Sequence, residues 1–120
     1  MRPLTIEEKH GVMVVSLDDG VVLNEAQNSS LRQVVYTAIS KSTSPKVAFD
    51  MTMIDYLTST GIAVLIGTLR RVHAAEGRLV LFGLRSEVLE LFGIMKLSNY
   101  FEMARDEAQA LQLLSSPPSS

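Results

Sequence analysis

The chain has 120 residues, of which 47% are hydrophobic and 20% are charged, and its formal net charge is −2 at pH 7. This length and composition are typical of one soluble globular domain and exclude a disordered chain. The slightly negative charge, without a basic stripe, argues against direct nucleic-acid binding. The absence of cysteine excludes disulfides, thiol catalysis and zinc sites of the cysteine type.

The sequence contains neither a recognisable secretion signal nor a recognisable catalytic motif. The first nine residues lack the apolar stretch of a secretion signal, and no apolar run is long enough to span a membrane. We therefore expect a cytoplasmic protein without membrane insertion. No nucleophile has an adjacent base, the glycines lack the spacing of a phosphate-binding loop, and the two histidines have no metal-binding partners. We expect neither an enzyme nor a cofactor or metal site.

The first forty residues predict two strands and a helix. Residues 4–8 alternate in polarity, residues 12–17 are rich in β-branched side chains, and His10-Gly11 between them indicates a hairpin turn. Residues 21–23 extend this strand or form a third one. Apolar residues then recur at helical spacing, which predicts a first helix from about residue 25 to about residue 40.

The central segment predicts a buried strand, a loop and a helix that begins at a group of hydroxyls. Val47-Ala48-Phe49 is a short apolar run typical of a strand covered on both faces, and Asp50 ends it. Thr58-Ser59-Thr60 stands at the start of an apolar helical run, where a hydroxyl can accept hydrogen bonds from free backbone N–H groups. An ordinary helix cap is one interpretation. Because the same N–H groups and the helix dipole favour negative charge, a modifiable hydroxyl at an anion-tolerant position is the other.

The rest of the chain alternates strands with helices. We expect the second helix to run to about Ala75, with Gly77 as a left-handed stop. Further elements follow in order: an apolar strand at 78–83, a third helix capped by Ser86, a short strand at 100–103 and a last helix capped by Asp106.

This order predicts one α/β domain over residues 1–114, with a mixed sheet of four or five strands and about four helices. Residues 115–120 are a Ser/Pro sequence that we expect to be a disordered tail. In such sheets, functional sites lie at the carboxyl ends of strands. The loop from Asp50 to Thr60 is at such an end.

Three segments stand in an order and spacing that a known family shares: Phe49-Asp50-Met51-Thr52, Tyr56-Leu57-Thr58-Ser59-Thr60-Gly61-Ile62 and Gly77-Arg78-Leu79-Val80-Leu81-Phe82-Gly83. Together with the helix at 88–92 and Met95-Lys96-Leu97, they resemble a STAS domain, the fold of bacterial anti-sigma factor antagonists. The resemblance covers the whole chain except its tail.

The resemblance implies a phosphorylated hydroxyl and a set of partners. In the family, the serine immediately before the glycine is phosphorylated by a partner anti-sigma factor kinase. That position is Thr60 here, Ser59 is the alternative acceptor, and Thr58 stands where the family usually has aspartate. The unmodified protein is then expected to bind an anti-sigma factor serine/threonine kinase and to free a sigma factor. The phosphorylated protein is released, and a PP2C-type phosphatase resets it.

A partner-binding surface is expected on the loop after the central strand and on the start of the next helix. Residues 62–66 are apolar on all sides of the helix, so one side faces the sheet and the other is covered by neighbours or left for a partner. Met and Tyr suit such contacts, whereas Asp50 can instead stabilise a turn. The expected contact residues are Asp50, Met53, Ile54, Tyr56, Thr58, Ser59, Thr60, Ile62 and Ala63.

The departure at Thr58 leaves a second interpretation open. The chain is then a STAS subunit that does not switch and that docks a permanent partner in a transporter or signalling assembly. Phosphorylation of Thr60 or Ser59 distinguishes the two interpretations.

Overall fold

The computed structural model describes residues 4–9, 11–17, 33, 35–41, 44–54 and 59–115. Within this part of the chain, five strands form one sheet in the order β1-β2-β3-β4-β5. The strands are β1 (Leu4–Lys9), β2 (Val12–Leu17), β3 (Lys46–Asp50), β4 (Arg78–Phe82) and β5 (Glu102–Ala104). Strands β1 and β2 pair antiparallel and every other pair is parallel, which confirms the predicted mixed sheet.

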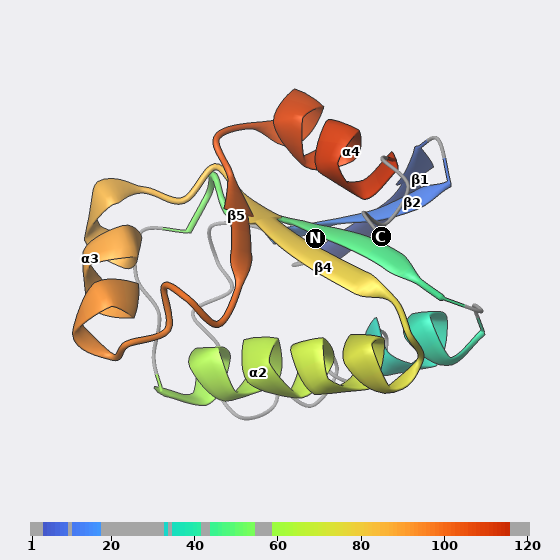
Figure 1. The fold of residues 1–120 in the computed structure, drawn as a ribbon, viewed down its shortest axis with the longest axis horizontal. Coiled ribbons are helices and arrows are strands. Elements are labelled where there is room, and N and C mark those ends of the chain that lie inside the picture. The colour runs from blue at the N-terminus through green and yellow to red at the C-terminus, as the bar shows by residue number, and fades with distance from the viewer. Residues whose placement is uncertain are drawn as a thin grey trace.

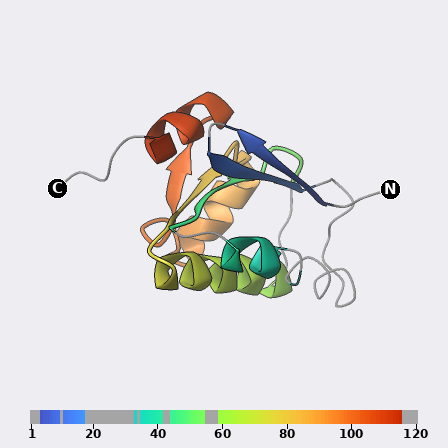
Figure 2. The same ribbon diagram turned by 90° about the vertical axis from the view of Figure 1, so that its right-hand side faces the viewer.

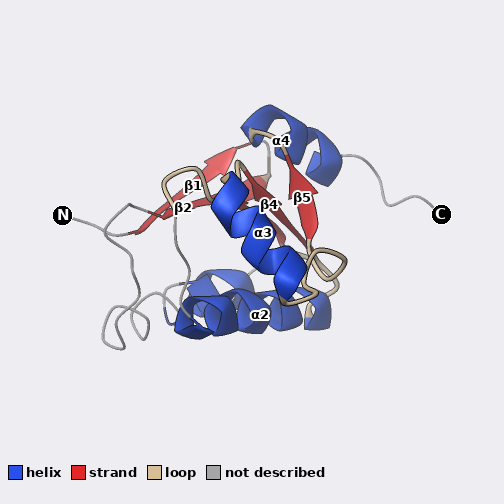
Figure 3. Cartoon of the chain, turned by 90° about the vertical axis from the view of Figure 1, so that its left-hand side faces the viewer, coloured by secondary structure: helices blue, strands red, loops and turns tan. Residues whose placement is uncertain are grey.

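Helices cover the sheet on both faces. They are α2 (Ser59–Ala74), α3 (Ser86–Ile94) and α4 (Glu107–Ser115), and residues 33 and 35–40 are helical as well. Helices α2 and α4 lie on opposite faces of the sheet, with α3 at one end (Figure 1). Residues 35–40 lie beside α2 on the same face (Figure 2). Seen from the end that α3 occupies, α3 lies between α4 above and α2 below (Figure 3).

The alternation of side chains along the strands creates two apolar layers. The main core lies between the sheet and α2, α3 and residues 35–40; its strand side chains include Val47, Phe49, Leu79 and Leu81. The second layer lies between the sheet and α4, and its strand side chains include Val12, Val14, Ala48, Val80 and Phe82. Strand β3 therefore buries side chains on both faces, as its continuous apolar run predicts.

The predicted hairpin between β1 and β2 is confirmed. Lys9 pairs with Val12, which leaves a two-residue loop, and Gly11 in that loop has a φ of +78°. Tight hairpin turns need positive φ, and glycine adopts it without a steric cost.

The end of α2 differs from the prediction at one residue. The left-handed residue is Glu76, with a φ of +62°, and not Gly77. The Gly77 N–H donates to the Val72 carbonyl at 2.8 Å and the Glu76 N–H to the His73 carbonyl at 3.0 Å, which is the paired pattern of a Schellman motif. Gly77 is needed for a different reason, because a Cβ there would overlap the carbonyl oxygen of Pro45.

The starts of the last two helices give one correction and one confirmation. The prediction that Ser86 caps the third helix is wrong, because the extended N-cap residue is Arg85, whose side chain makes no capping hydrogen bond. Asp106 caps α4 as predicted, since its carboxylate accepts the Gln109 N–H at 2.9 Å. The final strand begins at Glu102, two residues later than expected.

Some expectations fall where the structure gives no description. These are the strand at 21–23, the first part of the first helix and the tail from residue 116 on, whereas the helical residues up to 40 agree with the predicted end of that helix. Helix α4 includes Ser115, one residue beyond the predicted domain end. Among the described residues, no helix is long and apolar enough to cross a membrane.

Candidate functional site

The chain makes a sharp turn directly after β3. The Oδ1 atom of Asp50 accepts hydrogen bonds from the Thr52 N–H at 2.9 Å and from the Thr52 Oγ1 at 2.6 Å. The Ile54 N–H donates to the Met51 carbonyl at 3.0 Å and closes the turn. Asp50 therefore stabilises the turn, which is the alternative that the sequence left open for it.

The two end residues of this turn are buried, and the two residues between them are exposed. Met51 is fully buried, Ile54 is 3% exposed and Met53 is 45% exposed. We predicted Ile54 as a partner contact, but the structure places it in the main core, where it anchors the end of the turn. Met53 is the large apolar side chain that this turn presents to solvent.

Helix α2 begins at the predicted hydroxyls. Its first two residues are Ser59 and Thr60, and its first turn contains no acidic residue. Their backbone N–H groups are among the first four, which have no acceptor inside the helix. The positive end of the helix dipole is therefore not neutralised by a carboxylate of the same turn. The predicted site residues Tyr56 and Thr58, like the side chains of Ser59 and Thr60, lie outside what the structure describes.

The next turn of α2 divides into a buried and an exposed side. Ile62 is 4% exposed and packs in the main core, so the structure does not place it on a partner surface as we predicted. Ala63 is exposed. The apolar start of α2 is thus mostly core, and Ala63 is the described part of it that a partner can reach.

Two residues that lie against Thr52 were not predicted from the sequence. A Cβ at Gly83, whose φ is +72°, would overlap the Thr52 Cγ2, and the Arg85 Nε donates to the Thr52 carbonyl at 2.9 Å. A glycine directly after a strand is a visible signal in the sequence. The arginine gives no such signal, because its contact joins residues from different loops that only the fold brings together.

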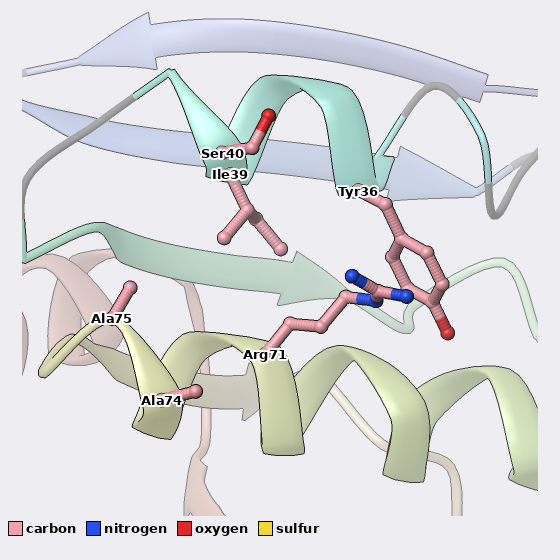
Figure 4. Close-up of a pocket in the computed structure, with 6 residues that line it drawn as sticks. All are labelled: Tyr36, Ile39, Ser40, Arg71, Ala74 and Ala75. Atoms are coloured by element: carbon pink, nitrogen blue, oxygen red, sulfur yellow. The ribbon is translucent and has the colours of Figure 1, made fainter.

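A groove of about 260 Å³ lies elsewhere, between residues 35–40 and the second half of α2 (Figure 4). The Arg71 guanidinium lies 4.0 Å from the centre of the Tyr36 ring, a cation–π contact. Arg71 follows Thr60 by about three helical turns, so the groove is separate from the start of α2. The lining residues are Tyr36, Ile39, Ser40, Arg71, Ala74 and Ala75.

The STAS domain family matches this chain over residues 3–110. The chain is similar to an anti-sigma-B factor antagonist of Listeria monocytogenes, with 35% identity over 60 residues. That alignment covers 50% of this chain and 53% of the relative, so it spans about half the length of the Listeria protein. The chain is also similar to BtrV of Bordetella bronchiseptica, which is named as an anti-sigma factor antagonist; this alignment has 26% identity and covers 89% of this chain and 90% of the relative.

The fold agrees with solved structures. An anti-sigma factor antagonist (STAS) domain protein from Planctomyces limnophilus superposes with a TM-score of 0.85 at 16% identity. The superposition covers 94% of this chain and 98% of that protein, which confirms the predicted STAS fold. The chain therefore belongs to the STAS domain family.

Proposed function

We propose that the unmodified chain binds an anti-sigma factor kinase and thereby frees a sigma factor, and that phosphorylation of Thr60 ends this binding. Ser59 is the alternative acceptor. The observation that carries the proposal is that α2 begins at Ser59, with Thr60 as its second residue. The two hydroxyl-bearing residues thus stand at the positive end of a 16-residue helix.

The fold tolerates a phosphate at this position for an electrostatic reason. A phosphate adds about −1.5 to −2 charges and strong hydrogen-bond acceptors at pH 7. The free N–H groups of the first turn of α2 are suitable donors, and no acidic side chain of that turn repels the added charge. The effect of phosphorylation is therefore expected on the partner rather than on the stability of the domain.

The partner surface combines the turn after β3 with the exposed side of α2. Met53 and Ala63 are exposed on these two elements, and we add Tyr56 and Thr58 from the intervening loop as proposed contacts. A partner on this surface must approach the first turn of α2. A phosphate there adds bulk and negative charge and must be desolvated, and the loss of a single good contact costs about tenfold in affinity for each 1.4 kcal/mol.

Binding of a candidate anti-sigma factor kinase from the same organism tests the proposal. We expect Thr60→Glu to weaken binding at least tenfold while the circular dichroism spectrum and melting temperature stay unchanged. Thr60→Ala should bind like the unmodified chain but resist release by ATP, and a PP2C-type phosphatase should restore binding of the phosphorylated wild type. Ser59→Ala is the matched control and should still be released. If Thr60→Glu binds as tightly as the wild type, the switch does not work through this position.

A second function is favoured by one residue. Thr58 stands where the family usually has aspartate, and a missing carboxylate can weaken kinase recognition. The chain would then dock permanently in a transporter or signalling assembly. Intact mass after incubation with the kinase and ATP separates the two: one added phosphate supports the switch, whereas an unchanged mass together with copurification of a membrane complex supports the docking subunit.

A further inference from the structure

Thr52 is held by three neighbours, of which one is the last residue of β3 and two lie in the loop between β4 and α3. Asp50 accepts hydrogen bonds from both its N–H and its hydroxyl, Gly83 leaves room for its methyl group, and Arg85 donates to its carbonyl oxygen at 2.9 Å. We call these four residues the Thr52 cluster. It joins the turn after β3 to the loop between β4 and α3.

The Arg85 end of this cluster is itself fixed. Arg85 is the N-cap residue of α3, and its carbonyl accepts the N–H groups of Val88 and Leu89 at 3.0 and 2.9 Å. Its side chain therefore extends from an anchored backbone to Thr52. The Gly83 end is anchored as well, because its N–H donates to the Ala104 carbonyl at 3.3 Å.

The turn that the cluster holds has one exposed apolar side chain. Met51 and Ile54 anchor its two ends in the core, and the section between them is fixed by the Thr52 cluster. If the Arg85 contact is lost, the ends stay anchored, but the Thr52 carbonyl loses its charged donor. The direction of Met53, the next residue, is then free to vary while the fold persists.

We propose that Arg85 is a positioning residue for partner recognition: it holds the Met51–Ile54 turn so that Met53 points to the partner in one conformation. The partner side of this inference rests on the proposed function. Hydrogen bonds from charged donors are stronger than neutral ones, but Arg85 is exposed, so its effect is moderate. Without the Arg85 contact the turn is loose in the free protein. Part of the binding free energy must then be used to order it, which lowers the affinity.

The test compares Arg85→Ala with Arg85→Lys and with the control Arg105→Ala. Arg105 is an exposed arginine in the loop between β5 and α4, so its removal changes the net charge equally. Two quantities are measured for each: amide hydrogen exchange of Ile54, whose N–H closes the turn, and affinity for a candidate anti-sigma factor kinase from the same organism. We expect Arg85→Ala to speed the exchange and weaken binding by roughly five- to tenfold each, as for the loss of one ordinary solvent-exposed hydrogen bond. Arg85→Lys should recover most of both, and Arg105→Ala should match the wild type.

The melting temperature separates positioning from folding. It should stay within about 3 °C for Arg85→Ala, since the core anchors remain. Equal exchange and equal binding in Arg85→Ala and Arg105→Ala would overturn the inference, as would a loss of binding accompanied by global destabilisation. If the wild type does not bind the kinase at all, the proposed function fails instead. In that case faster Ile54 exchange in Arg85→Ala alone still supports the positioning role, and unchanged exchange refutes it.

Discussion

The end of α2 gives a sharp test, because adjacent residues there should respond in opposite ways to substitution. Glu76 is held at a φ of +62°, whereas Gly77 is not in the left-handed region. Replacing Glu76 with glycine removes a backbone strain of about 1–2 kcal/mol and adds flexibility to the unfolded chain that costs about 0.5–1 kcal/mol. We therefore expect Glu76→Gly to raise the free energy of unfolding by about 0.5–1 kcal/mol.

Gly77→Ala should lower the free energy of unfolding, and by a larger amount. The added Cβ would overlap the Pro45 carbonyl oxygen and lie 2.9 Å from the Pro45 C and Cδ atoms. These backbone and ring atoms cannot rotate away, and the same carbonyl accepts the Arg78 N–H at 2.9 Å, at the start of β4. Overpacking costs about 1–3 kcal/mol and a disturbed hydrogen bond about 1 kcal/mol. The expected loss is about 3 kcal/mol or more.

Urea unfolding followed by circular dichroism measures both changes, and thermal melts provide a second measurement. At this chain length, 1 kcal/mol corresponds to roughly 4 °C in melting temperature. Glu76→Gly should therefore melt a few degrees higher, and Gly77→Ala roughly 10 °C lower. A destabilised Glu76→Gly together with a nearly neutral Gly77→Ala would refute the reasoning, because it would show that Glu76 is not strained and that a Cβ at Gly77 meets no obstacle at Pro45.

Other predictions concern the second layer, an ion pair and an exposed side chain. Leu114 of α4 is fully buried in the second apolar layer, so Leu114→Ala, which removes three carbons and leaves a cavity, should cost about 3 kcal/mol in urea unfolding; a loss below about 1 kcal/mol would contradict this packing. The hydrogen bond and charge of Glu107 raise the pKa of Lys9 above its ordinary 10.5. The contribution of the Lys9–Glu107 pair to folding stability is therefore complete below pH 10.5 and is lost as the pH rises through the folded-state pKa of Lys9. Titration of Lys9 by NMR should show a lower pKa in Glu107→Gln, and an identical pKa would rule this pair out as the cause. Ile94 is 74% exposed, so Ile94→Ser should change the free energy of unfolding by no more than about 0.5 kcal/mol, and a larger loss would indicate a contact that a solvent-exposed side chain cannot make.

The sequence predicted those elements whose signals are local. The apolar run Val47-Ala48-Phe49 indicated a strand buried on both faces, His10-Gly11 indicated the hairpin, and Asp106 indicated the start of α4. Each depends on residues within a few positions of one another. The start of α2 at Ser59 belongs to the same class, because hydroxyls favour the first turn of a helix.

Long-range contacts account for what the sequence did not reveal. Gly77 reads as a helix stop, but the reason for the glycine is Pro45, a residue more than thirty positions away. Arg85 contacts Thr52 across a similar separation. Ile54 and Ile62 are apolar residues near a proposed surface, and no local pattern shows that both face the core. The sequence alone therefore could not separate these two buried side chains from exposed neighbours such as Met53 and Ala63.

The placement of α4 has a consequence for synthesis of the chain on the ribosome. Sheet neighbours are also neighbours in sequence, so each strand can pair with the one made just before it. The second apolar layer, however, is covered by the last helix of the described chain. Until the residues of α4 have been synthesised, the face of the nascent sheet that α4 covers stays exposed, and this is the interval in which self-association is most favourable.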